Sequence, residues 1–388
     1  MAQWIPLRPA RVALLRVVAP LTLVLGLAHL ACGPTTPTAT SRPSLSASTA
    51  PTPAAEASAP LDTGSAEVTE PPSPFHHVFR DEVSIARVGA TVAVFSPKIV
   101  GIFRGTSLFV DRPMNAALTG CGSGEPGVST IEEMLGDDAE KPLVVTAISD
   151  GLGGTTRTLS SWDGKQWKSL LVGNDHTRYV ARGGFILSAA RYFSSWSYAL
   201  RSMGGARFTP TSHPRCKGND HLQAEDLFGD ERGGVLVAGG DPCESSKGFG
   251  IERFASKGGR GTIQWFGDMP QPESPYAMSD PHTLWGIAEE KDLVRLDLEH
   301  GSSKRMAGPA ADRIWGLAIV DSVMWLGAGE KVFRGRDGTD WEELPLPRGV
   351  HPTRLVAVSD GGVWVAAPDG VWTTVSGVPE TTFPTTCP

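Results

Sequence analysis

The sequence predicts an all-β fold, a β-propeller of seven four-stranded blades that follows a disordered N-terminal linker. Similar segments recur along the chain, and each contains a β-rich run, a tight polar turn and a second β-rich run. A single segment cannot cover both faces of its own sheet, so the copies must stack against one another. A ring of stacked sheets leaves only short, protected edges. Six or eight blades remain open alternatives, because the first two copies are poorly defined.

The last two copies show the repeat most clearly. Val323–Gly329 is followed by Lys331–Phe333, and 39 residues later Val363–Pro368 is followed by Gly370–Trp372. Two apolar runs around a polar turn are typical of a β-hairpin. Taking one central strand for each copy places these strands, at steps of 53, 40, 51, 49, 40 and 39 residues, near Val92, Val145, Phe185, Leu236, Trp285, Trp325 and Trp364.

The turns and the chain ends add detail to this ring. Asp163-Gly164 and Asp337-Gly338 supply the positive φ of a tight hairpin turn. Because the first and last blades of a ring are neighbours, residues 75–79 are expected to add a strand to the last blade. Residues 105–142 form the longest irregular stretch, and the capping box Ser129–Glu132 predicts a short helix within it.

The segment from Ser359 to Trp372, SDGGVWVAAPDGVW, carries a family resemblance. It resembles the propeller repeat of extracytoplasmic two-component sensors, which reads D-x-x-G-x-[LIV]-W-[LIV]-G-T-x-x-G-[LIV]. Ala366-Ala367 replace the glycine-threonine pair, and only the last two or three copies match well. The resemblance implies the propeller fold, whereas it carries little information about function.

The N-terminal residues 1–31 have the composition of an export signal. Three arginines and no acid precede an apolar run from Val17 to Ala31, and Cys32 follows. The run of about 15 residues is short for a membrane-spanning helix, which needs about 20. The pattern resembles a bacterial lipoprotein signal, which implies cleavage before Cys32 and lipid attachment to its thiol. A secretory signal without lipid and an uncleaved membrane anchor are the alternatives.

Residues 32–74 are predicted to form a disordered linker behind this cysteine. Of the 42 positions from 33 to 74, 32 are Pro, Thr, Ser or Ala, and none is aromatic. Such a chain cannot bury enough apolar surface to offset the entropy of ordering it. The remaining residues, 75–388, are the predicted propeller domain, and the linker would hold it away from the lipid headgroups.

Charge and compartment limit the possible partners. The net charge of −7 becomes −10 once the three arginines of the signal are removed. Clustered Lys and Arg are what bind phosphate backbones, so the composition argues against nucleic acid as a partner. The expected location is the bacterial cell envelope, lipid-anchored in the outer membrane because Gly33 is not an aspartate, or otherwise periplasmic or secreted.

Four further cysteines belong to the body of the chain. An even number in an oxidising compartment predicts two disulfides, and four cysteines allow three pairings. Cys216 and Cys243 are the closest pair in sequence. If they pair, Cys121 and Cys387 would link the first blade to the last. The candidates are Cys121, Cys216, Cys243 and Cys387. The alternative is a metal site made with His213, Asp220 and His221, although the C-x₂₋₄-C spacing of zinc sites is missing.

No catalytic motif was found in the chain. It contains no G-x-S-x-G, H-E-x-x-H, P-loop or EF-hand sequence, and its four tyrosines have no recognisable setting. The sequence therefore favours a non-catalytic envelope protein without a cofactor that binds a protein or a glycan. The alternative is an envelope glycan hydrolase or lyase acting in the propeller channel. Three or more charged or histidine side chains converging at the channel mouth would favour the enzyme.

Overall fold

The fold was analysed in a computed structural model of the chain. The structure describes residues 72–119, 130–149, 154–192, 195–212, 220–243, 248–267, 269, 271–310, 312–359 and 361–384. The predicted signal, Cys32 and nearly all of the predicted linker therefore lie outside the described residues. Within the described residues, no helix is long and apolar enough to cross a membrane.

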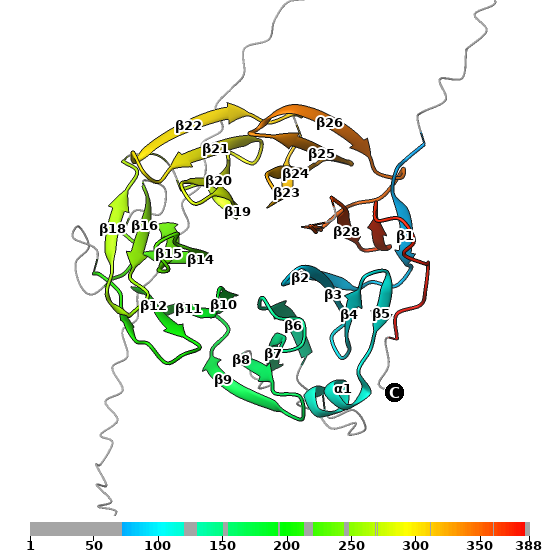
Figure 1. The fold of residues 1–388 in the computed structure, drawn as a ribbon, viewed down its shortest axis with the longest axis horizontal. Helices are drawn as coiled ribbons and strands as arrows, with labels where there is room; N and C mark the ends of the chain where they lie inside the picture. Colours follow the sequence, from blue (N-terminus) through cyan, green and yellow to red (C-terminus); the bar gives the residue numbers. More distant parts are fainter. Residues whose placement is uncertain are drawn as a thin grey trace, which may run out of the picture. The chain divides into compact units, whose positions relative to one another are not determined.

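Seven antiparallel sheets, here called blades 1 to 7, surround a central channel (Figure 1). In each blade the first strand lies at the channel and later strands lie further out. Blade 1 contains β2 (Ser84–Val88), β3 (Thr91–Phe95), β4 (Val100–Arg104) and β5 (Ser107–Phe109). Blade 2 contains β6 (Thr130–Leu135), β7 (Leu143–Ser149), β8 (Thr155–Trp162) and β9 (Trp167–Gly173). Blade 3 contains β10 (Thr177–Arg182), β11 (Phe185–Tyr192) and β12 (Ser195–Ser202).

The remaining blades complete the ring and confirm the predicted seven. Blade 4 contains β14 (Gln223–Gly229), β15 (Val235–Gly240), β16 (Phe249–Phe254) and β18 (Thr262–Trp265). Blade 5 contains β19 (Glu273–Asp280), β20 (Thr283–Ala288), β21 (Asp292–Asp297) and β22 (Ser302–Ala307). Blade 6 contains β23 (Ile314–Val320), β24 (Val323–Ala328), β25 (Lys331–Arg336) and β26 (Thr339–Pro345). Blade 7 contains β27 (Arg354–Ala357), β28 (Val363–Ala367), β29 (Gly370–Thr373) and β1 (His76–Phe79).

The ring is closed by the N-terminal strand, as the sequence predicted. Strand β1 is the outermost strand of blade 7 and pairs antiparallel with β29. His76 lies opposite Thr373, and His77 lies opposite Trp372. Phe79 is fully buried and packs edge-on against Phe383, with 5.7 Å between the ring centroids. The two ends of the described chain therefore hold each other in place.

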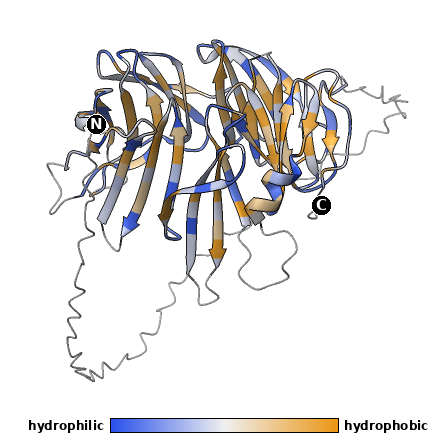
Figure 2. Ribbon diagram, turned by 60° about the horizontal axis from the view of Figure 1, so that its bottom comes forward, coloured by the Kyte–Doolittle hydropathy of each residue, from blue (hydrophilic) through white to orange (hydrophobic). Residues whose placement is uncertain are grey.

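The core consists of apolar layers between neighbouring blades (Figure 2). All seven central positions predicted from the repeat lie on the second strand of a blade. Three of them are tryptophans with at most 2% of their surface exposed: Trp285, Trp325 and Trp364. The indole of Trp364 packs against Phe103 of blade 1, with 4.6 Å between ring centroids. These large side chains fill the spaces between blades, where burial removes apolar surface from water.

Blades 3 and 4 are joined by a different device. The outer position of blade 3 is held by a single bridge between Arg201 and Arg207 and by β13 (Phe208–Thr209), which pairs parallel with β17 (Gly259–Arg260). The fully buried carboxylate of Glu252 fixes the chain that follows β13. Its Oε1 accepts a 2.7 Å hydrogen bond from the Thr211 backbone N–H, and its Oε2 accepts one from the Tyr198 hydroxyl. A polar anchor thus joins these blades.

The predicted helix at Ser129–Glu132 is wrong, because Thr130–Leu135 is strand β6. Ile131 and Met134 are buried against blade 1, and β6 pairs with β7. Tertiary packing therefore overrides the local capping signal. The helix of this region is α1 (Arg112–Thr119), and its N-terminus is capped by Asp111, whose Oδ1 accepts a 3.2 Å hydrogen bond from the Met114 N–H.

Candidate functional site: the central channel

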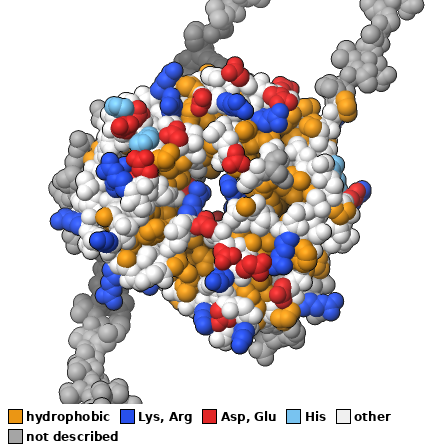
Figure 3. Space-filling model, in the orientation of Figure 1, with side chains coloured by type: hydrophobic (Ala, Val, Ile, Leu, Met, Phe, Trp, Pro, Cys, Tyr) orange, Lys and Arg blue, Asp and Glu red, His pale blue; other side chains and the backbone are white. Residues whose placement is uncertain are grey.

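A cavity lies in the channel at the centre of the ring. Its volume is about 690 Å³, within the range of sites that bind small molecules or short segments. All seven first strands, β2, β6, β10, β14, β19, β23 and β27, contribute to its wall. In the space-filling view the channel opens at the centre of one face, with charged side chains of both signs around the opening (Figure 3).

The charged side chains of the channel come from blades 1, 2, 3, 4 and 7. Four of them are cationic and three are anionic. They are Arg87, Arg178, Arg182 and Arg354, and Glu133, Asp137 and Asp226. Blades 5 and 6 contribute no charged residue to the wall. We call the wall of blades 1 to 4 and 7 the charged arc, and the wall of blades 5 and 6 the apolar arc.

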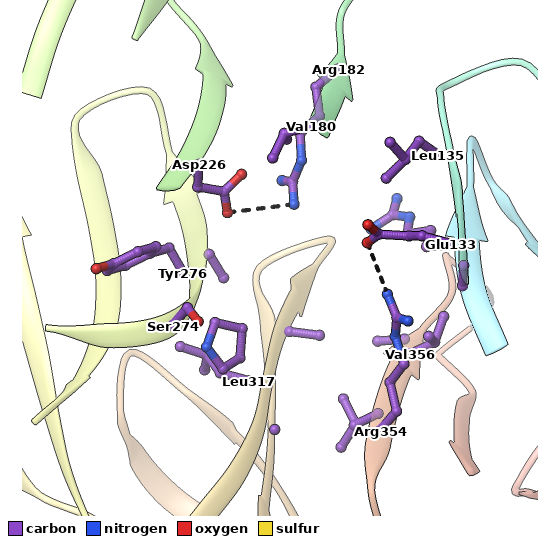
Figure 4. A pocket seen from close by; sticks show the side chains of 18 of the residues that line it. Glu133, Leu135, Val180, Arg182, Asp226, Ser274, Tyr276, Leu317, Arg354 and Val356 are labelled. Carbon is purple, nitrogen blue, oxygen red and sulfur yellow. Dashed lines mark ion pairs between the residues drawn. The ribbon is translucent and has the colours of Figure 1, made fainter. Parts of the chain in front are cut away.

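The alternation of strand β10 places two arginines on the charged arc. Arg178, Val180 and Arg182 are two residues apart and share one side of the strand, whereas Tyr179 and Ala181 are buried. Arg182 and Val180 extend toward the channel interior (Figure 4). Strand β10 therefore presents its two guanidinium groups to the channel while its other face packs in the core.

Two ion pairs cross between blades inside the channel (Figure 4). The Nη2 of Arg354 lies 3.6 Å from the Oε1 of Glu133, and the Nη2 of Arg182 lies 3.8 Å from the Oδ2 of Asp226. Both distances exceed the 2.7–3.2 Å of an ordinary N–H···O hydrogen bond. The N–H groups of these guanidinium groups are thus incompletely used by their partners.

Arg178 is the cation with the most unused hydrogen-bonding capacity. It lies close enough to Glu133, Glu225 and Asp226 to lower the pKa of each carboxyl. Its guanidinium group nevertheless makes no hydrogen bond or ion pair with another described residue. A guanidinium carries five N–H donors, so Arg178 can bind an incoming acceptor without breaking an existing contact.

Burial raises the pKa of two acids that line the channel, Asp226 and Glu133. The pKa of Asp226 lies above its ordinary value because burial disfavours the charged form, and Arg182 offsets only part of this effect. Burial likewise raises the pKa of Glu133, and Arg354 and Arg178 partly counteract it. The arginines therefore offset only part of the effect of burial on these two carboxyl groups.

A second layer supports the wall behind Asp226. The Oε1 of Glu225 accepts a 2.6 Å hydrogen bond from Gln271, and its Oε2 accepts a 3.3 Å hydrogen bond from the Tyr276 hydroxyl. The same hydroxyl also donates to the carbonyl of Pro272. Tyr276 is 3% exposed, and burial raises the pKa of its phenol well above the ordinary value. This tyrosine stays protonated and serves as a structural donor.

Two further hydrogen bonds lie toward the ends of the first strands, one made by Arg87 and one by Asp137. The Nε of Arg87 donates a 2.9 Å hydrogen bond to the carbonyl of Gly89. The pKa of Arg87 is lowered, first by burial and then by the nearby charge of Arg182. Asp137 accepts a hydrogen bond from the Gly183 N–H. Two guanidinium groups from blades 1 and 3 therefore face a common region of the channel.

The apolar arc contrasts with these charged walls. Its partly exposed residues in the channel include Pro275, Ala318 and Ile319, whereas Ala277 and Leu317 line the wall from the buried core behind them. The indole Nε1 of Trp315 donates a 2.9 Å hydrogen bond to the carbonyl of Gly329, so its polar atom is already satisfied. Among the described residues of the wall, Trp315 is the one aromatic side chain that is not buried.

The residues singled out from the sequence lie elsewhere. Cys32, Cys121, Cys216 and Cys387 fall outside the described residues, whereas Cys243 lies within them. The predicted disulfides and their pairing therefore stay predictions. Asp220 accepts a 3.2 Å hydrogen bond from the Trp196 N–H, and the Nδ1 of His221 lies 3.2 Å from the Thr211 carbonyl oxygen. Across the described residues, no three His, Cys, Asp or Glu side chains form a metal-binding group.

Sequence reasoning missed the charged residues of the channel, although the repeat contains a signal for them. Four wall residues lie ten positions before the central residue of their blades. They are Asp226, Pro275, Trp315 and Arg354, which precede Leu236, Trp285, Trp325 and Trp364. The residue at this sequence offset is thus charged in blades 4 and 7 and uncharged in blades 5 and 6. Aligning the copies would have identified it as a position of variable chemistry.

Comparisons with known proteins define the fold. No protein-family model and no curated protein matches the chain. Among solved structures, it resembles the extracellular domain of BT4673 from B. thetaiotaomicron, assigned to a hybrid two component system, with 12% identity, a TM-score of 0.50 and coverage of 78% of this chain and 39% of that chain. The chain thus spans well under half of that domain, and the resemblance to sensor propellers holds at the level of the fold.

Two smaller propellers match over nearly their whole length. Streptogramin B lyase shares 11% identity with a TM-score of 0.50 and covers 77% of this chain and 96% of that chain. YCF48 bound to D1 peptide shares 9% identity with a TM-score of 0.50 and covers 79% of this chain and 95% of that chain. Identities this low show a common fold and leave the activity to be argued from the channel.

Proposed function

We propose that this protein is a lipid-anchored binding propeller of the bacterial cell envelope, whose channel receives a segment of a partner protein. The observation that carries the proposal is the state of the channel arginines. Arg178 has no partner within the described residues, and the ion pairs of Arg182 and Arg354 are longer than hydrogen bonds. A channel of about 690 Å³ with unused donors is suited to recognition.

A protein partner fits the channel better than a glycan. Sugar rings are commonly held by exposed aromatic faces, and in the described wall Trp315 is the single aromatic side chain that is not buried. Seven charged residues line the wall instead. A structure of similar fold, YCF48, was solved with a D1 peptide bound, which shows that a propeller of this size can accept a peptide.

The binding role can be tested with the full-length protein, purified in detergent from its own membranes. Partners are crosslinked and identified by mass spectrometry for the wild type, for Arg178→Gln and for Arg295→Gln. Arg295 is an exposed arginine on the third strand of blade 5 and is the matched control. The proposal expects a partner that is lost from Arg178→Gln and kept by Arg295→Gln. Equal capture by both variants would contradict it.

The anchor is a separate part of the proposal and has its own test. Cys32 follows a signal-like segment, and no described helix spans a membrane. Mass spectrometry of the mature N-terminus is expected to show an acylated Cys32. The variant Cys32→Ser is expected to move from the membrane fraction to the soluble fraction. An unmodified N-terminus elsewhere in the chain would contradict the anchor and leave the binding role standing.

A second candidate function is an envelope glycan hydrolase or lyase that acts in the same channel. Seven charged residues line the wall, more than the three that were expected above to favour an enzyme, and two of its acids, Glu133 and Asp226, have raised pKa values, as a general acid requires. Binding remains the favoured function because each of these acids faces an arginine, and Tyr276 is too strongly protonated to act as a nucleophile. Release of reducing ends from purified envelope glycan, abolished by Asp226→Asn, would establish the enzyme.

A further inference from the structure

The wall of the channel is amphipathic around its circumference. Strand β10 with Arg178 and strand β23 with Ala318 lie on opposite sides of the ring (Figure 1). In the close view, Leu317 of β23 lies away from Arg182 and Glu133 (Figure 4). A ligand that fills the channel therefore touches charged groups on one side and apolar groups on the other.

We propose that the bound segment is an amphipathic peptide, with an acidic side chain toward Arg178 and Arg354 and an aliphatic or aromatic side chain toward blades 5 and 6. This inference rests on the proposed binding function and specifies the chemistry of its partner. The wall carries four arginines against three acids, so one added carboxylate brings its charge to balance. A basic side chain would enter a wall that already has an excess of positive charge.

The unused N–H donors of the channel arginines favour an acidic side chain, as the net charge of the wall does. A carboxylate can accept two parallel N–H bonds from one guanidinium group. Arg178 makes no hydrogen bond or ion pair within the described residues, and the Nη2 of Arg354 is 3.6 Å from Glu133. Both arginines can therefore bond an acceptor placed between them without losing a short contact.

The apolar arc sets the second requirement. Trp315 already uses its indole N–H, so the residues of β23 in the wall offer an incoming group no unpaired side-chain donor or acceptor. In blade 5 the hydroxyl of Ser274 also lines the wall. A polar side chain placed against β23 would lose its water without gaining a side-chain hydrogen bond, which is costly. An aliphatic or aromatic side chain gains from the same burial.

A groove beside the channel gives the peptide a path to leave it. A cavity of about 450 Å³ lies where blades 7, 1 and 2 meet and shares Thr353 and Arg354 with the channel. Its wall includes Ser84, Pro97 and Pro368. A segment whose acid meets Arg354 in the channel can therefore continue through this groove to the surface.

The test selects random linear heptapeptides displayed on phage against the full-length protein. Enrichment is compared between the wild type, Arg178→Gln, Ala318→Asn and the control Arg295→Gln. Wild type and Arg295→Gln are expected to enrich peptides that combine Asp or Glu with an aliphatic or aromatic residue. Synthetic versions of these peptides are expected to bind Arg178→Gln about ten- to a hundred-fold more weakly and Ala318→Asn about three- to ten-fold more weakly.

Enrichment of basic peptides, of acids without apolar neighbours, or of no sequence at all would overturn this inference. So would equal affinity of the selected peptides for the wild type and for Arg178→Gln. Thermal unfolding of each variant shows whether it is folded, and Ala318→Asn supplies a second reading if Arg178→Gln is not. If the crosslinked partner still depends on Arg178 while no such peptide is selected, the binding function stands and its ligand has another chemistry.

Discussion

Blades 5 and 6 differ from blades 2 to 4 in how their sequences are used. In blades 5 and 6 the central strand carries a buried tryptophan, the step to the next copy is 40 or 39 residues, and the first strand presents no charge to the channel. In blades 2 to 4 the central residues are Val145, Phe185 and Leu236, the steps are 40, 51 and 49 residues, and the first strands are charged. Among these five blades, a buried central tryptophan thus goes with an uncharged first strand, whereas blade 7 combines Trp364 with the charged Arg354.

The interfaces between blades follow the same division. Trp325 of blade 6 packs among the apolar residues of blade 7, including Val363 and Val365. Blades 3 and 4 instead share the buried Glu252 and the short parallel pair of β13 and β17. An apolar joint tolerates no charge, whereas a polar joint depends on having each donor and acceptor satisfied. This difference predicts how each interface responds to substitution.

The largest loss of stability is expected for Trp325→Ala in blade 6, one of the two blades with an uncharged first strand. The side chain is 1% exposed, and its removal leaves a cavity between blades 6 and 7. Truncation of such an aromatic residue costs about 3–5 kcal/mol of the free energy of unfolding. Chemical denaturation measures it, with Trp341→Ala as a control, because Trp341 is only half-buried. An equal loss from both variants would show that the packed tryptophans do not hold these blades together.

A smaller effect is expected for Tyr198→Phe at the polar joint. The substitution removes the donor to the Oε2 of Glu252 and leaves a buried carboxylate with one hydrogen bond fewer, which costs about 1–3 kcal/mol at neutral pH. Tyr192→Phe is the control, because Tyr192 is exposed. Chemical denaturation at neutral pH compares the two variants with the wild type.

The pH dependence of this cost has a definite sign. The lost hydrogen bond favoured the carboxylate, so the variant raises the folded-state pKa of Glu252 further above the value that burial already gives it. A raised folded-state pKa gives stability that is present at low pH and lost as the pH rises through it. The variant is therefore expected to approach the wild type in acid and to fall below it toward neutral pH. A cost that grows in acid would contradict the role assigned to Glu252.

The sequence was sufficient to predict the ring because its signal lies in residues that are buried on both faces. Second strands such as β20, β24 and β28 are continuous apolar runs with a central tryptophan. Even the weak copies around Val92 and Val145 keep such a run, so all seven second strands were located. The closing strand β1 followed from ring geometry alone.

The channel could not be predicted in the same way. Residues that face it are only partly buried, so hydrophobic periodicity does not constrain them, and Arg178 and Asp226 look like ordinary surface charges in the sequence. Their proximity depends on the ring placing different blades side by side. Strand β6 was mistaken for a helix because its capping-box pattern is local, whereas the burial of Ile131 and Met134 against blade 1 is a long-range effect.

Acidification should strengthen the binding of the selected acidic peptides to the charged arc. Burial raises the pKa of Glu133 and Asp226, so these acids take up protons at a higher pH than ordinary carboxylic acids do. Each proton removes a negative charge beside an arginine, and affinity is expected to rise a few-fold. Fluorescence anisotropy of a labelled peptide measures this change. Asp226→Asn is expected to bind more tightly at neutral pH and to respond less to acid, whereas weaker binding in acid would count against the channel as the site.

The smallest loss of stability is expected from removing one ion pair, and blades 2 and 5 each offer a pair for comparison. In blade 2 the guanidinium of Arg157 bonds Glu132 at 2.5 Å and also the carbonyl of Asp175, and both charged side chains are about one-third exposed. In blade 5 the guanidinium of Arg305 bonds Glu289 at 2.6 Å and Asp292 at 2.6 Å on the outer, solvated strands.

Water screens both ion pairs, and the screening is stronger for the exposed one. Arg157→Gln is therefore expected to cost about 0.5–1 kcal/mol of the free energy of unfolding, discounted for its partial exposure. Arg305→Gln is expected to leave the midpoint of chemical denaturation unchanged, because an exposed pair exchanges one hydrated state for another. Measurements at low and high salt check the cause, since salt should reduce the cost of Arg157→Gln. A larger loss from Arg305→Gln would mean that blades 5 and 6 depend on surface charge as well as on their buried tryptophans.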